Sequence, residues 1–396
     1  MGRGNWTQTR PPLLVAVALV TAAAAGALWA SGLADWMPLP FQGTEPAVVR
    51  SSVAKPTVSG TAKIAAGKAS VSKTGNAVAG SAPAGSHGSK ASPAARAAKT
   101  GRASANASTM AASSIDLCAK AGSATMPDGE SVDIWGFALK SGTGCDDAGV
   151  VAQLPGPELD VNQGDDVTLN VTNTLDRPIS IEVPGIDFDP GPTDVAAGAT
   201  VALSFHAGSE GTYLYDSAGD AGRQAAMGLY GAMVVHSSSA NQAYGNAFDL
   251  ERVLVLSEID PELNSGPDAF VMNNWSPKYW LINGKAYPDT PMIDVASGQK
   301  LLLRYLNAGS DNNTVTMLGL RQRVLARDAY ALADPFDVVT QTFPSGETSD
   351  ALITIPVGAA AGSKFPVYNR NLQLANGSPG ASNHSPGGMM TFIHVP

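Results

Sequence analysis

Residues 155–164 read PGPELDVNQG and are followed at 166–173 by DVTLNVTN. About 135 residues further on, 291–298 read PMIDVASG and are followed at 301–309 by LLLRYLNAG. Each copy consists of short alternating runs bounded by Gly, Pro, Asn and Asp, the pattern of strands in a β-sandwich or barrel. Two copies in the same order predict two related β-domains.

The repeat continues through the rest of each half in the same order. The further matching segments are VAAG at 195–198 with FPSG at 343–346, GTYLY at 211–215 with FPVY at 365–368, and GLYGAMVV at 228–235 with GGMMTFI at 387–393. No stretch of this region has a sustained apolar period of 3.6 residues, so we expect helices to be minor.

These segments resemble the multicopper oxidases, a family of repeated cupredoxin domains that includes laccases. Two more segments carry the likeness, LINGK at 281–285 and LNAGS at 306–310, and the resemblance runs from Leu154 to the C-terminus. It implies an all-β chain of two tandem cupredoxin-like Greek-key β-sandwich or barrel domains. We assign these domains to residues 115–245 and 246–396.

The resemblance implies copper, but the histidine content does not fit the copper sites of the family. A type 1 copper takes two His and one Cys thiolate, often with a distant Met, and the family's three-copper cluster takes eight His in His-x-His pairs. The chain has five histidines, and no two have the His-x-His spacing: His87, His206, His236, His384 and His394. This number excludes a complete copper site within one chain.

Other residue types fall where the resemblance places the ligands. The first-half pairs fall on Glu182 and Pro184 and on Asp216 and Ala218; the second-half positions are Asn313, Thr316, Leu318, Leu320 and the triplet Asn369, Arg370 and Asn371. The triplet puts an arginine where the thiolate belongs, and a guanidinium cannot become a ligand because it does not deprotonate in proteins. We therefore expect no copper or other cofactor and no catalytic residue.

Oxygen ligands for a hard cation such as calcium remain possible. Glu182 and Asp216 could face each other, and Asp187, Asp189 and Asp194 lie in one loop rich in Gly and Pro. The alternative is that all five are ordinary carboxylates on the surface of an acidic protein.

A second metal hypothesis concerns the C-terminal segment. His384, Met389 and Met390 offer an imidazole and two thioethers, which suit Cu(I). The alternative is that at least one of the methionines belongs to the core of the last strand, and that His206 and His394 are ordinary edge or surface residues of strands.

The N-terminal third has the composition of an export signal and a tether. Residues 1–10 carry two arginines and form an expected cytoplasmic tail, and residues 11–34 are uncharged and long enough for a transmembrane anchor. A cleaved signal sequence ending near residues 25–27 is the alternative. Residues 35–114 form a linker of Ala, Ser, Lys, Gly and Pro that we expect to be disordered.

The charge distribution excludes one class of partner, and the cysteine content indicates the compartment. Residues 50–102 hold nine Lys and Arg and no acid, whereas the rest of the chain from Asp116 has 14 Lys and Arg against 32 Asp and Glu. An acidic body excludes nucleic acid as a partner. The two cysteines, Cys118 and Cys145, predict a disulfide in an oxidising compartment.

Three functions of different class follow from these observations. The first is a non-catalytic binding or assembly protein on a cupredoxin scaffold, in the periplasm or at the cell surface, tethered to the membrane or secreted. The second is a multicopper oxidase-type oxidoreductase with a non-standard or partner-completed site, and the third is a weak metal-binding or delivery protein. Expected partners are the membrane, through the N-terminal segment, and an unidentified protein or polymer. Other copies of the chain are a further expected partner, because some two-domain members of the family assemble as trimers.

Overall fold

The computed structural model describes residues 113–142, 144–191, 194–217, 219–371, 373–376 and 385–396. The predicted tail at 1–10, the apolar segment at 11–34, almost all of the linker at 35–114, and the residues His87, Ala218 and His384 lie outside these ranges. Within the described ranges no helix has the length and apolar content needed to cross a membrane. The predicted anchor therefore stays a prediction.

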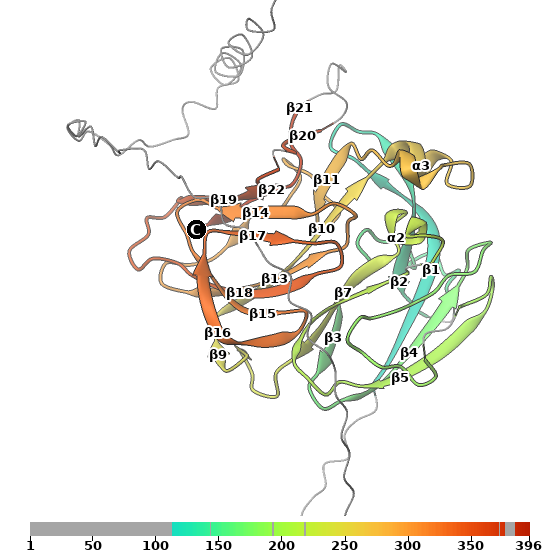
Figure 1. The fold of residues 1–396 in the computed structure, drawn as a ribbon, viewed down its shortest axis with the longest axis horizontal. Helices are drawn as coiled ribbons and strands as arrows, with labels where there is room; N and C mark the ends of the chain where they lie inside the picture. Colours follow the sequence, from blue (N-terminus) through green and yellow to red (C-terminus); the bar gives the residue numbers. More distant parts are fainter. Residues whose placement is uncertain (1–112, 143, 192–193, 218, 372, 377–384) are drawn as a thin grey trace, which may run out of the picture. The chain divides into compact units, whose positions relative to one another are not determined.

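The first half of the described chain is a β-sandwich (Figure 1). One sheet has the order β2-β1-β4-β5 and the other has the order β3-β7-β6. The strands are β1 (Ser113–Thr125), β2 (Ser131–Leu139), β3 (Leu159–Asn162), β4 (Asp166–Asn173), β5 (Thr200–His206), β6 (Gly211–Asp216) and β7 (Tyr230–His236). Alternate residues of β4 face inward, so Val167, Leu169 and Val171 lie in the apolar core between the sheets.

The second half is a larger sandwich of a six-stranded and a five-stranded sheet. The six-stranded sheet contains β11 (Tyr279–Ile282), β10 (Leu250–Ile259), β13 (Lys300–Asn307), β18 (Thr348–Thr354), β15 (Gln322–Arg327) and β16 (Tyr330–Val338), in that order. The five-stranded sheet contains β12 (Ile293–Asp294), β22 (Met390–His394), β19 (Lys364–Asn369), β14 (Asn313–Met317) and β17 (Thr340–Phe343). Two short hairpins complete the strands, β8 (Gln242–Ala243) with β9 (Asn246–Ala247) and β20 (Ala375–Asn376) with β21 (Ser385–Pro386).

Strand pairing follows the internal repeat seen in the sequence. In the first half β4 pairs with β1 in parallel and with β5 in antiparallel, and in the second half β13 pairs with β10 and β18 in the same way. Likewise β7 pairs with β3 and β6, and β22 pairs with β12 and β19, one parallel and one antiparallel in each case. The predicted repeat of two β-sandwiches is confirmed.

Helices are short among the described residues, as the absence of a helical period predicts. They are α2 (Arg223–Ala226), α3 (Pro261–Ser265) and the 3-10 turn η2 (Met272–Asn274). The Asp260 side chain caps α3 by accepting a hydrogen bond from the Glu262 amide at 3.0 Å. Although α3 belongs to the second half of the chain, its Leu263 is buried in the core of the first sandwich.

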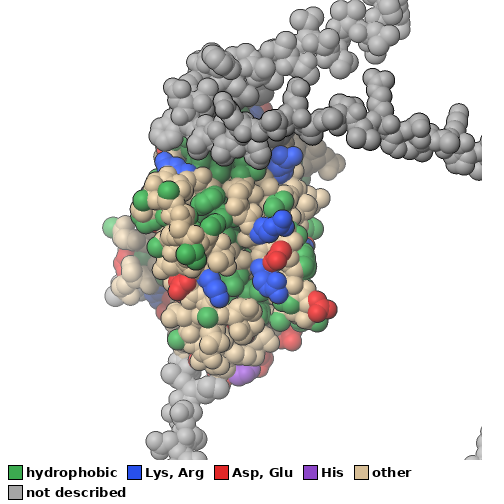
Figure 2. Space-filling model, turned by 90° about the vertical axis from the view of Figure 1, so that its left-hand side faces the viewer, with side chains coloured by type: hydrophobic (Ala, Val, Ile, Leu, Met, Phe, Trp, Pro, Cys, Tyr) green, Lys and Arg blue, Asp and Glu red, His purple; other side chains and the backbone are tan. Residues whose placement is uncertain are grey.

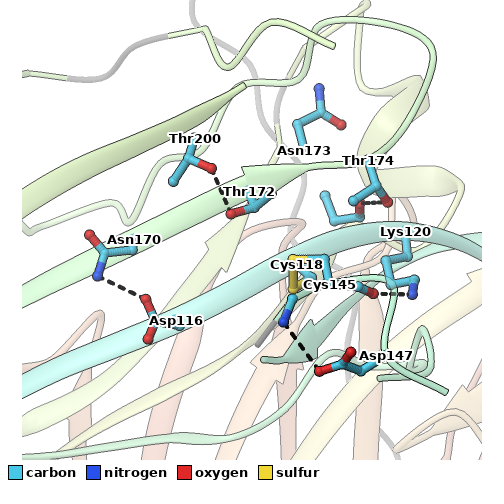
Figure 3. Close-up of a disulfide and its surroundings, with 12 residues drawn as sticks. Asp116, Cys118, Lys120, Cys145, Asp147, Asn170, Thr172, Asn173, Thr174 and Thr200 are labelled. Atoms are coloured by element: carbon cyan, nitrogen blue, oxygen red, sulfur yellow. Dashed lines mark hydrogen bonds between the residues drawn. A yellow bond between two sulfur atoms is a disulfide. The ribbon is translucent and has the colours of Figure 1, made fainter. Parts of the chain in front are cut away.

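A disulfide joins Cys118 of β1 to Cys145 in the loop after β2, as predicted (Figure 3). Both cysteines are buried with Ala138 and Val150 in a small apolar cluster. The Lys120 ammonium donates a hydrogen bond to the Cys145 carbonyl, which holds the loop against β1. The strand β1 starts at Ser113, the first described residue, and the predicted domain bounds at 115–245 and 246–396 stay predictions.

The side of the second sandwich that carries β16 is shown in Figure 2. Lys and Arg side chains alternate there with Asp, Glu and hydrophobic side chains. Arg323 of β15 and Asp337 of β16 form an exposed ion pair at 3.5 Å.

Candidate functional site

The two carboxylates at the predicted copper positions of the first sandwich are brought together by the backbone. Glu182 and Asp216 form an isolated antiparallel bridge, in which each amide donates to the other residue's carbonyl at 3.0 Å. Burial and the negative charge of Glu182 raise the pKa of Asp216 to about 7. Its Oδ1 atom is buried without a hydrogen-bond partner. Of the other two positions, Pro184 is exposed and Ala218 is outside the described residues.

In the second sandwich two of the predicted positions, Asn313 and Asn369, belong to a largely buried cluster of amide side chains. The Asn369 Nδ2 atom donates to Asn313 Oδ1 at 2.7 Å and to Gln373 Oε1 at 3.0 Å. The Asn313 Nδ2 atom donates to Glu258 Oε1 at 2.7 Å and to Asn307 Oδ1 at 3.0 Å. We call Asn307, Asn313, Asn369, Gln373 and Glu258 the amide cluster. It brings together the two segments that the resemblance assigned to copper ligands.

The polar atoms of the amide cluster are hydrogen-bonded within the cluster or to neighbouring backbone groups, as buried polar groups require. The Asn369 Nδ2 atom also donates a weak hydrogen bond to the thioether sulfur of Met389 at 3.5 Å. Neutral amides and a carboxylate supply neither the imidazole nor the thiolate donors that a type 1 copper takes. The donor set at this position does not fit copper.

The remaining predicted positions of the second sandwich are dispersed. Thr316 hydrogen-bonds Thr340 across β14 and β17 at 2.7 Å. Leu318 is exposed on the surface, and Leu320 is buried in the apolar core. The Arg370 side chain, at the position expected for a thiolate, lies at the surface.

Glu258 was not among the predicted site residues. It lies on β10 and is 3 % exposed, and its Oε2 atom accepts a hydrogen bond from the Ser310 amide at 2.9 Å. Burial raises the pKa of Glu258 to about 7, although its hydrogen bonds to Asn313 and to backbone amides oppose this rise. A side chain at Gly309 would collide with this carboxylate, since its Cβ would lie 2.0 Å from Oε2.

A cavity of about 160 Å³ connects the two candidate positions. It is lined by Asp216 and Tyr230 from the first sandwich and by Glu258 and Asn307 from the second. Asp216, one of the positions predicted for copper ligands in the first sandwich, therefore lines the same cavity as Glu258 and Asn307 of the amide cluster.

The described histidines pair with aspartates at the ends of strands. His206 bonds Asp166 at 2.8 Å, His236 bonds Asp160 at 2.8 Å, and His394 bonds Asp294 at 2.7 Å. These pairs keep the three imidazoles apart from one another, at surface positions on three different pairs of strands.

The other metal hypotheses find no assembled ligand group. No set of three or more His, Cys, Asp and Glu in the described ranges is arranged to hold a metal ion. Asp187, Asp189 and Asp194 are each exposed. Met389 is fully buried in the second core, Met390 begins β22, and the third member of that hypothesis, His384, is outside the described residues.

Comparison with known proteins shows that the chain is similar in sequence to copper proteins. Residues 146–240 match the family model described as multicopper oxidase. Multicopper oxidase MmcO of Mycobacterium tuberculosis is 24% identical over 249 residues, which are 54% of this chain and 48% of that protein. Copper resistance protein A of Escherichia coli is 34% identical over 117 residues, 26% of this chain and 18% of that protein. The chain spans about half or less of the length of these relatives.

Solved structures of copper proteins share the fold. The blue copper oxidase of Nitrosomonas europaea superposes with a TM-score of 0.62 at 21% identity, covering 72% of this chain and 86% of that one. The copper nitrite reductase of the same organism superposes with a TM-score of 0.56 at 18% identity, covering 72% and 94%. The two sandwiches are therefore cupredoxin-like, as predicted from the sequence.

Proposed function

We propose that this chain, a multicopper-oxidase-like protein built from cupredoxin-like β-sandwiches, holds no copper and serves outside the cytoplasm as a non-catalytic binding or assembly protein. The observation that carries the proposal is the amide cluster. Asn313 and Asn369 meet where copper ligands are expected, and they bond each other instead of converging on an empty centre. A copper ion at this position would have to break these hydrogen bonds and bind the amide groups instead. Neutral amides are not among the ligands that copper favours.

The scaffold does not need copper to stay folded. Each sandwich has its own apolar core of buried strand residues, and the second core includes Leu301, Leu303 and Tyr305 of β13 in complete burial. Burial of apolar surface is the dominant favourable contribution to folding. Loss of a metal site is therefore compatible with a stable cupredoxin-like fold.

Metal analysis tests the proposal directly. We would express the full-length chain in a copper-supplied host, measure metals by mass spectrometry and record the visible absorption spectrum. We expect copper well below one equivalent and no thiolate–copper band. A laccase expressed in the same host serves as the positive control for copper loading.

Other outcomes would favour the other two functions. Several tightly bound coppers, with oxidation of a phenolic laccase substrate, would overturn the proposal in favour of an oxidase completed by another subunit or site. One weak and exchangeable ion, lost in an Asp216→Asn variant, would favour a metal-delivery protein.

The proposed location outside the cytoplasm is supported by the Cys118–Cys145 disulfide, because disulfides persist in oxidising compartments. We infer that residues 11–34 export the chain and either tether it or are cleaved. Protease treatment of intact spheroplasts should digest an exported domain, whereas protection in intact spheroplasts and digestion only after lysis would place the domain inside. Mass spectrometry of the mature N-terminus distinguishes an anchor from a cleaved signal.

For the partner we propose another protein, a polymer or further copies of the chain. Analytical ultracentrifugation of the purified protein tests the last of these. A single monomeric species across micromolar concentrations would exclude self-assembly as the function.

A further inference from the structure

The cavity beside Asp216 contains buried polar groups that no protein atom satisfies. The Tyr230 side chain is 2 % exposed and lines the cavity, and its hydroxyl, which lies beside the Ser257 hydroxyl, forms no hydrogen bond of ordinary geometry. The Oδ1 atom of Asp216 and the indole Nε1 atom of Trp275, both from lining residues, are also buried without partners. Because buried polar groups are normally hydrogen-bonded, three such groups around one cavity indicate that something polar belongs there.

Two of these polar groups belong to residues that are paired across the strands β6 and β7. Asp216 and Tyr230 are directly opposite each other in the register of β6 and β7. Side chains of opposed residues stand about 5 Å apart at their Cβ atoms. Because both residues also line the cavity, a small ligand inside it lies next to both side chains.

The charge of the residues that line the cavity favours a cationic ligand. Asp216 and Glu258 contribute two carboxylates, and the described lining residues include no Lys, Arg or His. Glu258 is already held by Asn313 and Ser310, whereas Asp216 retains a free oxygen. A carboxylate buried without a countercharge favours a cation beside it.

The rest of the lining favours an organic cation over a metal ion. Leu214, Ala225, Ala226 and Ala308 supply an apolar wall. A hard metal ion needs six or more oxygen ligands, and no group of three metal-binding side chains exists within the described part of the chain. An alkylammonium has three N–H donors for the oxygens and a short carbon chain for the wall.

We propose that this cavity binds a small primary ammonium compound, whose ammonium group donates to Asp216 and to the Tyr230 hydroxyl. The inference rests on the proposed function, since a ligand at Asp216 occupies a position where the family would place copper. A hydroxyl on the ligand would also give the Trp275 N–H an acceptor, so ethanolamine fits the lining better than ethylamine.

Ligand-observed NMR on the full-length protein tests the inference with ethanolamine and ethylamine as probes. Ethylene glycol and acetate are the uncharged and anionic controls. For ligands of three or four heavy atoms, we expect dissociation constants of about 1 mM. Asp216→Asn should weaken ethanolamine binding about tenfold or more, and Tyr230→Phe about threefold or more, because each removes an acceptor or its charge.

Asp334→Asn is the matched control, because it removes an exposed carboxylate of β16 that does not line the cavity. It should leave the dissociation constant unchanged. Circular dichroism verifies that each variant is folded, and Tyr230→Phe is the conservative variant if Asp216→Asn is unstable. No saturation by either amine up to 50 mM, equal binding of ethylene glycol, or unchanged binding in both variants would overturn the inference, as would calcium binding that displaces the amine.

Copper content measured on the same sample separates this inference from the proposed function. Copper in the protein together with ammonium binding would overturn only the absence of copper. No copper and no ammonium binding would overturn only the assignment of the ligand.

Discussion

Arg304 Nη1 lies 3.0 Å from Asp350 Oδ2, and the two side chains are 1% and 2% exposed. They face each other across β13 and β18 of the second sandwich. Thr212 of the first sandwich joins them, since its hydroxyl donates to Asp350 Oδ1 at 2.5 Å and accepts from Arg304 at 3.0 Å. The ion pair therefore fixes the start of β6, the strand that ends at Asp216, against the second sandwich.

Asp350→Ala should destabilise the protein, because it removes the buried carboxylate beside Arg304 and leaves Glu251, 20% exposed, as the remaining charged partner of that guanidinium. Breaking a buried ion pair in this way costs about 3–5 kcal/mol. Urea denaturation followed by tryptophan fluorescence measures the change. Asp337→Ala, which removes the partner of the exposed Arg323, is the matched control and should cost about 1 kcal/mol or less.

The double variant Arg304→Met with Asp350→Leu should be closer in stability to the wild type than Asp350→Ala, because it removes both fully buried charges and fills the space, and the only carboxylate that loses its guanidinium partner is Glu251, which is 20% exposed. A double variant as unstable as the single one would contradict a mainly electrostatic cost.

The raised pKa of Glu258 predicts a pH dependence of stability. A carboxyl group whose folded-state pKa of about 7 exceeds the ordinary 4.5 stabilises the fold fully below pH 4.5 and loses this contribution as pH rises through 7. Glu258→Gln has no such proton to lose. Its free energy of unfolding, relative to the wild type, should therefore rise by up to about 3 kcal/mol between pH 4.5 and 8. Urea denaturation at five pH values checks this.

The matched control is Glu262→Gln, at a residue whose side chain is 75% exposed. The difference between this variant and the wild type should change by less than about 0.5 kcal/mol over the same range. A Glu258→Gln difference equally independent of pH would mean that the pKa of Glu258 is not raised in the folded protein.

The amide cluster predicts a loss of stability from a small truncation. Asn369→Ala removes the Nδ2 donor to Asn313 and to the partly buried Gln373, and it leaves the Asn313 oxygen buried without this donor. Each buried acceptor left unsatisfied costs about 1–3 kcal/mol, so we expect a midpoint of urea unfolding clearly below that of the wild type. Asn371→Ala, which removes an exposed hydrogen bond to the Asn312 carbonyl, is the control and should change little. Equal effects of the two variants would argue against a structural role for the cluster.

The two related β-domains were predictable because the same sequence pattern occurs twice. The segments at 155–173 and 291–309 became β3 with β4 and β12 with β13, in identical pairing. The hairpin of β1 and β2 was not individually predicted. Small residues such as Ala119, Ala121 and Gly122 give β1 no strong apolar alternation, and its strand conformation depends on pairing with both β2 and β4.

The site was predictable only as far as its positions were marked by resemblance. Asn313 and Asn369 were identified as replaced ligands, and the structure places them in contact. Glu258 was missed because its partners Asn313 and Ser310 are more than 50 residues away in the sequence. Its one local signal was an acidic residue inside the apolar strand run 253–259, which is uncommon for a fully buried position unless the charge is paired.

The disulfide predicts a measurable contribution to the stability of the first sandwich. Cys118 and Cys145 are 27 residues apart, and closing a loop of this length stabilises the folded state by about 3–4 kcal/mol in the chain-entropy description. The double variant Cys118→Ala with Cys145→Ala should unfold at lower urea concentration by a corresponding amount. Wild-type protein reduced with dithiothreitol under denaturing conditions and refolded without oxidant should match the variant. A variant as stable as the oxidised wild type would show that β1 and the loop after β2 are held by Lys120 and the apolar cluster alone.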